Sequence, residues 1–189
     1  MSSAWWLGWN CMLRLGAKGH TAANLIREGE GVLNLPSSAM AAAVDQLARL
    51  TGSDPVPPHK QAMGYGHCKD KFGAAGLTAQ GSELVKPPRV LECPVQMEAV
   101  LEATHNFGRR PDRETTAYAF EVRVVRVYAE EAVLMSGGVA GAEDRIDPDA
   151  WRPLIMSFCQ MYGLGGRAGI SRLAEIPERL YRPAAAMGR

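Results

Sequence analysis

The chain of 189 residues is 47% hydrophobic and 22% charged, which is typical of one globular domain that builds its own core without metal or disulfide staples. This composition excludes a disordered chain, a collagen-like chain and a long coiled coil. With 21 basic and 20 acidic residues, the net charge of +1 leaves no broad field to attract nucleic acid or an anionic membrane, so we expect neither partner.

The start of the chain lacks the features of an export signal or a membrane span. Residues 1–6 carry no basic flank, and Asn10 and Arg14 interrupt the apolar stretch that follows. The four cysteines lie tens of residues apart, without the spacing of zinc ligands (Cys11, Cys68, Cys93 and Cys159). We therefore expect free thiols, a cytoplasmic location and no metal site.

The first half of the chain is predicted to combine strands with short helices. From Trp5 to Leu15 the apolar residues fall at every second position, which is typical of a strand with one buried face. Thr21 is a candidate N-cap for a helix that ends at Gly29. A compact strand, a second helix that Ser37 or Ser38 caps and Gly52 ends, and a loop rich in proline and glycine follow (31–35, 39–51 and 53–70).

The second half is predicted to be mostly strand. A short turn or helix (71–76) and a polar loop (79–89) precede an alternating, half-buried antiparallel strand that begins at Val95. From Phe120 a second alternation changes phase at Val125, which predicts a β-bulge there or a strand that crosses a barrel corner. A short return strand at 133–135, a helix opened by Asp147-Pro148 and a tail at 166–189 complete the chain. Short strands with few helices favour a mainly β fold, a small barrel decorated by helices.

The segment that joins the first strand to the first helix is the strongest local candidate for a binding site. It offers free backbone N–H groups at a helix N-terminus, the Thr21 hydroxyl, the Lys18 ammonium and the His20 imidazole. Such a set of donors is a generic anion site. An ordinary N-cap at Thr21 explains most of the same pattern equally well.

Other patterns point to no specific chemistry. The chain has no Gly-x-Ser-x-Gly elbow, and no lysine follows Gly163-x-Gly165-Gly166 as a phosphate loop would require. The aromatic cluster of Trp5, Trp6 and Trp9 is assigned to the core on composition alone. No catalytic residue is assigned.

Several segments, read in order, resemble one family. They are Ser2 to Trp6, then 20–25 with 32–36, 70–72 with 75–78, 86–95, 146–148 with 153–154, and Tyr162-Gly163. Their order and spacing are similar to those of the flavin reductase-like family of FMN-binding split barrels, over residues 2–165. The resemblance implies an antiparallel Greek-key barrel with added helices. Residues 166–189 are then expected to form a C-terminal tail that packs on the barrel.

The resemblance also implies where a cofactor binds. It places FMN at the interface of a homodimer, with one segment along the isoalloxazine and ribityl chain (Ser2, Ser3, Ala4, Trp5 and Trp6). The segment with His20, Thr21 and Asn24 is expected to hold the phosphate, and Lys18 joins this cofactor-binding set. Lys71 is expected to lie near the flavin or the facing subunit. Of Trp5 and Trp6, one would then face the core and the other the flavin.

The function that the resemblance implies is an FMN-dependent oxidoreductase that accepts hydride from NADH or NADPH. The cofactor would carry the chemistry. Two alternatives stay open: an FMN-binding electron-transfer or binding module without pyridine-nucleotide activity, and a truncated chain with weak flavin binding. Family members carry further residues before the segment that matches Ser2. We therefore expect the strand that starts at Trp5 to keep an unpaired outer edge.

Overall fold

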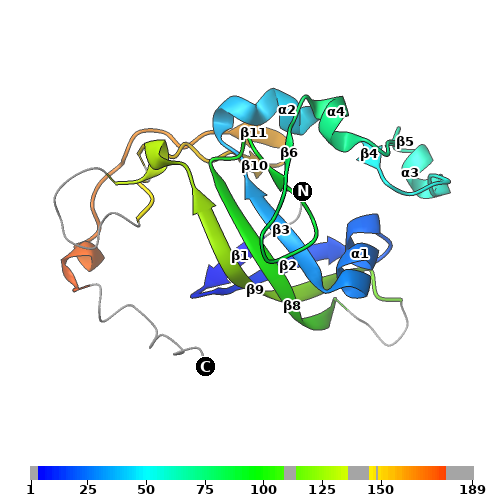
Figure 1. Cartoon of the computed structure of the whole chain (residues 1–189), viewed down its shortest axis with the longest axis horizontal. Helices are drawn as coiled ribbons and strands as arrows, with labels where there is room; N and C mark the ends of the chain where they lie inside the picture. The colour runs from blue at the N-terminus through cyan, green and yellow to red at the C-terminus, as the bar shows by residue number, and fades with distance from the viewer. Residues whose placement is uncertain (1–3, 109–113, 136–144, 148, 178–189) are drawn as a thin grey trace.

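A computed structural model describes residues 4–108, 114–135, 145–147 and 149–177. Its centre is a five-stranded antiparallel sheet with the strand order β1-β2-β9-β8-β3 (Figure 1). The strands are β1 (Ala4–Leu7), β2 (Asn10–Gly16), β3 (Glu30–Leu35), β8 (Val95–Phe107) and β9 (Ala117–Ala129). The expected mainly β fold is confirmed.

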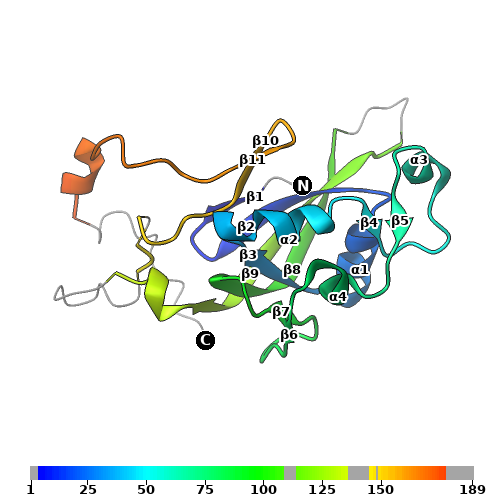
Figure 2. The same cartoon turned by 90° about the horizontal axis from the view of Figure 1, so that it is seen from above.

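The remaining elements are short and lie mostly in the connection between β3 and β8. This connection holds η1 (Ser38–Met40), α2 (Ala41–Gln46), β4 (Leu50–Thr51), α3 (Pro58–Gln61), β5 (Gly66–His67), α4 (Lys71–Ala75), β6 (Ala79–Gln80) and β7 (Arg89–Val90). Helix α1 (His20–Glu28) joins β2 to β3. After β9 come η2 (Glu131–Val133), β10 (Ile155–Ser157), β11 (Gln160–Tyr162) and η3 (Arg172–Glu175). Figure 2 shows α3, β4 and β5 beside α1.

The core lies where α1 packs on the sheet. Its buried members come from β2, α1, β8 and β9 (Cys11, Ala22, Leu25, Ala99, Phe120 and Val122). The rings of Tyr118 and Phe120 meet edge to face, with centroids 5.7 Å apart. Within the described ranges no helix has the length and hydropathy needed to cross a bilayer.

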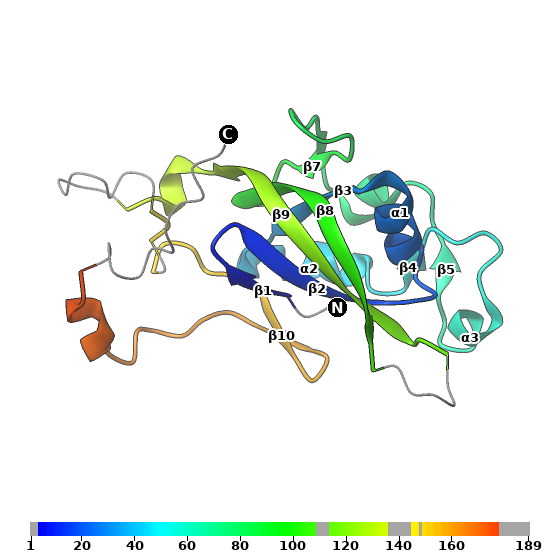
Figure 3. The same cartoon turned by 90° about the horizontal axis from the view of Figure 1, so that it is seen from below.

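The stretch from Trp5 to Leu15 is a hairpin, so the prediction of one continuous strand is wrong. The chain reverses at Gly8, whose φ of +61° is open to glycine at little cost. Strand β1 then pairs back along β2, while the other edge of β2 pairs with β9 (Figure 3). Strand β2 is thus paired on both edges, whereas β1, which carries Trp5, is the edge strand of the described sheet and pairs with β2 alone, so the expected unpaired outer edge lies on β1.

The predicted bulge in β9 is confirmed at the residue where the alternation changes phase. Arg126 pairs with Glu98 and Val124 pairs with Ala99, so Val125 is the extra residue. A second shift in the register follows between Leu101 and Ala103 on β8. Both irregularities bend the two long strands at the centre of the sheet.

Several other expected elements differ from the structure. The second helix is split into η1 and the shorter α2, and the loops at 53–70 and 79–89 contain short helices and strands. The expected return strand at 133–135 is wrong: η2 occupies its first residue, and Leu134 makes only an isolated bridge with Ile146. At the last expected helix, Asp147 accepts a hydrogen bond from the N–H of Asp149, and Pro148 lies outside the described residues. The described part of the tail carries η3.

Candidate functional site

The N-terminus of α1 is built by the backbone rather than by a capping side chain. Gly19 is the N-cap, with φ −82° and ψ 139°, and no side chain among the described residues caps the helix. Thr21 is the second helical residue, so its expected place as N-cap is wrong. A Cβ atom on Gly19 would lie 2.9 Å from the Gly16 carbonyl oxygen, which explains a glycine at this turn. The N–H groups of the first turn are thus left without a capping side chain.

A cavity of about 620 Å³ opens at this helix start, and we call it the polar cavity. Lys18, Gly19 and Thr21 line it from the β2–α1 connection. The other walls come from the segment around α3 and from the residues before β9 (His59, Lys60, Tyr65, Glu114, Thr115 and Thr116). Lys18 and Thr21 were expected from the sequence at such a site. The wall residues from the segment around α3 were not expected, because the sequence of that segment predicts a loop without regular structure.

A second cavity of about 440 Å³, here called the apolar cavity, lies between α1, β2 and β3. Ala4, Thr21 and Asn24 line it together with apolar side chains of the sheet (Leu13, Leu33, Ala99 and Val122). Leu15 and Thr21 line both cavities, so the two adjoin along the first turn of α1. The Asn24 Oδ1 atom is buried and has no hydrogen-bond partner among the described residues, which leaves an acceptor for a ligand.

The structure brings together only some of the residues expected at the site. Ala4, Lys18, Thr21 and Asn24 line the two cavities. His20 instead lies against Gly52, the residue after β4: a Cβ on Gly52 would be 2.9 Å from the His20 Cδ2 atom.

The other expected site residues lie elsewhere. Lys71 is the first residue of α4 and lines neither cavity, while Ser2 and Ser3 lie outside the described residues. The side chain of Asp70 caps α4 through a 2.9 Å hydrogen bond from the Gly73 N–H. In a single chain, Lys71 is therefore separate from the cavities.

The tryptophans are exposed, so their assignment to the core is wrong. Trp5 is 58% exposed and Trp6 is 41% exposed. Trp6 pairs with the buried Cys11 and shares its face of the hairpin with Ala4, whereas Trp5 points to the opposite face. Trp6 is thus the tryptophan on the side of the apolar cavity.

The charges around the polar cavity are mostly cationic. Lys18 Nζ lies 3.3 Å from the Glu114 carboxylate, and both side chains are exposed. Lys60 Nζ lies 3.3 Å from Thr51 Oγ1 and 5.8 Å from the centre of the Tyr65 ring. An exposed ion pair contributes little free energy, so Lys18 is free to turn toward an anion in the cavity.

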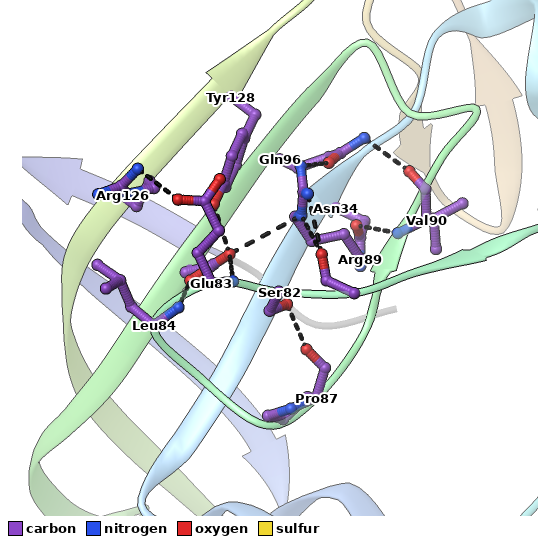
Figure 4. A network of polar contacts seen from close by, with 12 residues as sticks. Asn34, Ser82, Glu83, Leu84, Pro87, Arg89, Val90, Gln96, Arg126 and Tyr128 are labelled. Carbon is purple, nitrogen blue, oxygen red and sulfur yellow. Dashed lines mark hydrogen bonds and ion pairs between the residues drawn. The ribbon is translucent and has the colours of Figure 1, made fainter.

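A buried polar network fixes the segment that supplies Pro87 to the wall of the apolar cavity (Figure 4). Glu98 on β8 is fully buried and accepts hydrogen bonds from the N–H groups of Glu83 (2.9 Å) and Leu84 (2.7 Å). It also accepts one from the Tyr128 hydroxyl at 2.8 Å. Arg89 stacks on the Tyr128 ring at 3.7 Å and donates to the Gly81 carbonyl at 2.9 Å. The loop before β7 is therefore held to β8 and β9 by side chains that the sequence pattern did not single out.

The network shifts the pKa values of its members. Burial alone would raise the pKa of Glu98, but the two N–H donors and the Tyr128 hydroxyl outweigh it and hold that pKa below its ordinary value. Burial and the hydrogen bond to Glu98 raise the pKa of Tyr128 to about 12. Both groups thus keep their neutral-pH forms, an ionised carboxylate and a protonated phenol.

The cysteines and carboxylates suggest no second reactive centre. Burial raises the pKa of both Cys11 and Cys93 to about 11, so neither is a thiolate at neutral pH. Among the described residues no cluster of His, Cys, Asp and Glu could hold a metal ion. The adjoining cavities remain the best candidate: donors at one end and an apolar slot at the other suit a ligand with an anionic group and a flat apolar body.

Comparison with known proteins assigns a family and a fold. A family model described as the flavin reductase like domain matches residues 7–143. The uncharacterized protein YdfE of Bacillus subtilis (strain 168) is 36% identical over 169 residues, which cover 89% of this chain and 77% of that protein.

Solved structures with the same fold include nitrilotriacetate monooxygenase component B from Bacillus cereus, with a TM-score of 0.65 at 23% identity over 85% of this chain and 71% of that one. Flavoredoxin of Desulfovibrio vulgaris (Miyazaki F) gives 0.64 at 21% identity, covering 88% and 76% of the two chains. A putative flavin reductase with a split barrel domain from Shewanella frigidimarina gives 0.63 at 16% identity, covering 89% and 75%. The split-barrel fold that the sequence motifs indicated is confirmed.

Proposed function

This chain belongs to the flavin reductase-like domain family, and from that membership we propose that it is an FMN-binding oxidoreductase that accepts hydride from NADH or NADPH. When bound, the flavin supplies the redox chemistry, and the protein supplies binding, orientation and a defined electrostatic environment. The single observation that carries the proposal is the pair of adjoining cavities, with donors at one end and apolar side chains at the other.

The polar cavity suits the phosphate of FMN. The first turn of α1 directs backbone N–H groups and the positive end of the helix dipole toward it, and both favour a dianion. Lys18 and the Thr21 hydroxyl lie on the cavity wall and would donate to the phosphate oxygens. His20 would act from outside the wall, by holding the helix start against Gly52.

The apolar cavity suits the ring system and part of the ribityl chain. Ala4 and the face of β1 that carries Trp6 border it, next to the segment with Ser2 and Ser3 that we assign to the same part of the ligand. Asn24 Oδ1 would accept a hydrogen bond from a ribityl hydroxyl, which would satisfy the orphaned acceptor. Side chains from β2, β3 and β8 would exclude water from that half of the ligand.

We propose further that two copies of this chain form a homodimer with FMN at the interface. The hairpin of β1 and β2 exposes Trp5, Trp6 and Trp9, and the turn between β10 and β11 exposes Phe158 at 98%. A surface with this many exposed aromatic side chains is typical of an interface rather than of a monomer. Lys71 would then approach the flavin of the facing subunit.

The proposed location is the cytoplasm. All four cysteines are unpaired, and two of them are buried. Free thiols of this kind fit a reducing compartment.

The absorbance spectrum of the purified protein, before and after FMN is added, tests cofactor binding. A bound flavin gives a shifted visible band, and denaturation then releases FMN. Anaerobic mixing with NADH or NADPH tests the reductase activity, because hydride transfer bleaches that band within seconds. A flavin that binds but is not bleached by either nucleotide would support an electron-transfer module instead, and a protein that binds no flavin would contradict both proposals.

A further inference from the structure

Lys60 on α3 presents a cation to the polar cavity, and no carboxylate of the described residues pairs with it. Its side chain is half-buried and lines the cavity opposite the start of α1. Its Nζ atom donates to Thr51 Oγ1 at 3.3 Å, and Thr51 is only 3% exposed. Among the residues that the structure describes, Lys60 forms no ion pair.

The local fold builds this position rather than leaving Lys60 on a free loop. The backbone N–H of Lys60 donates to the Pro57 carbonyl at 2.8 Å, and its own carbonyl accepts from the Tyr65 N–H at 3.0 Å. The short parallel pair of β4 and β5 places Thr51 opposite His67, which closes the segment at its base. Lys60 therefore enters the cavity with its backbone fixed on both sides.

The charges around the polar cavity favour the binding of an anion next to Lys60. The first turn of α1 on the opposite wall carries the positive end of the helix dipole. Among the described residues that line the cavity, the one carboxylate, that of Glu114, already lies 3.3 Å from Lys18. Holding a partly desolvated ammonium near other positive groups is unfavourable unless a negatively charged ligand enters the space between them.

We propose that Lys60 is a specificity-determining residue that makes this protein select phosphorylated flavins over riboflavin. This inference rests on the proposed flavin site and adds a residue that lies outside the β2–α1 connection. Lys60 donates a charge-assisted hydrogen bond to the phosphate from the α3 side, opposite the donors of α1. Thr51 is its positioning residue, because its hydroxyl holds the ammonium at the cavity wall.

Fluorescence titration with FMN and with riboflavin tests the proposal in the wild type and in Lys60→Met, Lys60→Arg and Lys69→Met. Lys60→Met should weaken FMN binding by about 10-fold or more and leave riboflavin binding unchanged, because only FMN has the phosphate. Lys60→Arg keeps the charge and should retain most of the preference for FMN. Lys69 is exposed on the same connection but lines neither cavity, so Lys69→Met should match the wild type.

Riboflavin is the internal control, because a variant that folds poorly loses affinity for both flavins. The ratio of the FMN and riboflavin dissociation constants within each variant therefore reports the phosphate contact alone. If Lys60→Met keeps the wild-type ratio while riboflavin still binds, the assignment of Lys60 is wrong and the proposed function stands. If the wild type binds riboflavin and FMN equally well, the phosphate specificity itself is wrong. A wild-type protein that binds neither flavin would reject the proposed function, and the Lys60 assignment with it.

Discussion

At the scale of single residues, the structure distinguishes two roles of Thr21, an N-cap of α1 and a ligand-binding hydroxyl, which the sequence could not distinguish. An N-cap and a ligand-binding hydroxyl require the same residue types before a helix. Gly19 is the N-cap, and no side chain of the described residues, that of Thr21 included, caps the helix. Thr21 instead lines both cavities. The structure therefore argues against the capping explanation and leaves phosphate binding as the proposed role of the Thr21 hydroxyl.

Thr21→Ala should weaken FMN binding by about 10- to 150-fold, the value of one hydrogen bond to a charged group. The free energy of unfolding should change by less than about 0.5 kcal/mol, because no cap is lost. Flavin titration and thermal denaturation of the same variant measure both quantities. A fall of about 1 kcal/mol in stability with unchanged FMN affinity would restore the capping explanation.

Glu98 and Tyr128 make stability depend on pH in a defined direction. The pKa of Glu98 is lower in the folded protein than in the unfolded chain, so its contribution is present above the ordinary glutamate pKa and is lost as the pH falls through the folded value. Tyr128→Phe should cost about 1.5–3 kcal/mol at pH 7 and less at acid pH, where Glu98 is protonated. Denaturant unfolding at several pH values measures this, with Tyr162→Phe as an exposed control. Equal losses at neutral and acid pH would show that the hydrogen bond to ionised Glu98 is not what stabilises the protein.

At the scale of elements, some of the fold could be read from periodicity and some could not. The bulge at Val125 was predictable because an extra residue changes the phase of the alternation in the same strand. The hairpin of β1 and β2 was not, since the odd-numbered apolar residues continue through the turn. Trp5 and Leu7 then lie on the exposed face, whereas Cys11 lies on the buried one. The alternation of apolar residues therefore gave no sign that the chain reverses between β1 and β2.

Sequence patterns also predicted only part of the candidate site. Lys18 and Thr21 could be found because they adjoin a strand-to-helix junction, a local signal. Lys60 could not, because it reaches the cavity through the tertiary packing of a segment whose prolines and glycines indicate only a loop. Glu98 and Arg89 were hidden for a related reason, since their partners lie on other strands and loops.

The β1–β2 turn gives a test at this scale. Gly8 adopts a φ of +61°, a conformation that costs other residues about 1–2 kcal/mol. Gly8→Ala should lower the free energy of unfolding by about that amount, as measured by denaturant titration. Gly81→Ala is the matched control, because Gly81 has a negative or extended φ and open space around its Cα. Equal effects of the two substitutions would show that the turn does not depend on Gly8.

At the scale of the whole molecule, the exposed aromatic side chains are the observation on which the proposed homodimer rests. They lie on both faces of the hairpin of β1 and β2, with Trp6 on the face of the apolar cavity, and on the turn between β10 and β11. In the proposed dimer, a second copy that covers these side chains would remove apolar area from water.

Light scattering at micromolar concentration should therefore return twice the chain mass of 20.4 kDa. Trp5→Ser combined with Trp9→Ser should shift the protein toward monomer and lower its FMN occupancy, because these exposed side chains would face the partner. A wild-type monomer would contradict the dimer. A dimer that survives the double substitution would place the interface elsewhere on the surface.

The shared wall of the two cavities has a thermodynamic consequence. Because Leu15 and Thr21 border both spaces, a ligand that fills one end holds its other end at a high effective concentration next to the second space. Each half of a flavin nucleotide, an inorganic phosphate or a bare tricyclic ring, would then bind weakly by itself. The covalently joined molecule would bind far more tightly than either fragment, since only one loss of translational freedom accompanies two sets of contacts. On the proposed function, the first turn of α1 would therefore make affinity depend on the covalent link between phosphate and ring.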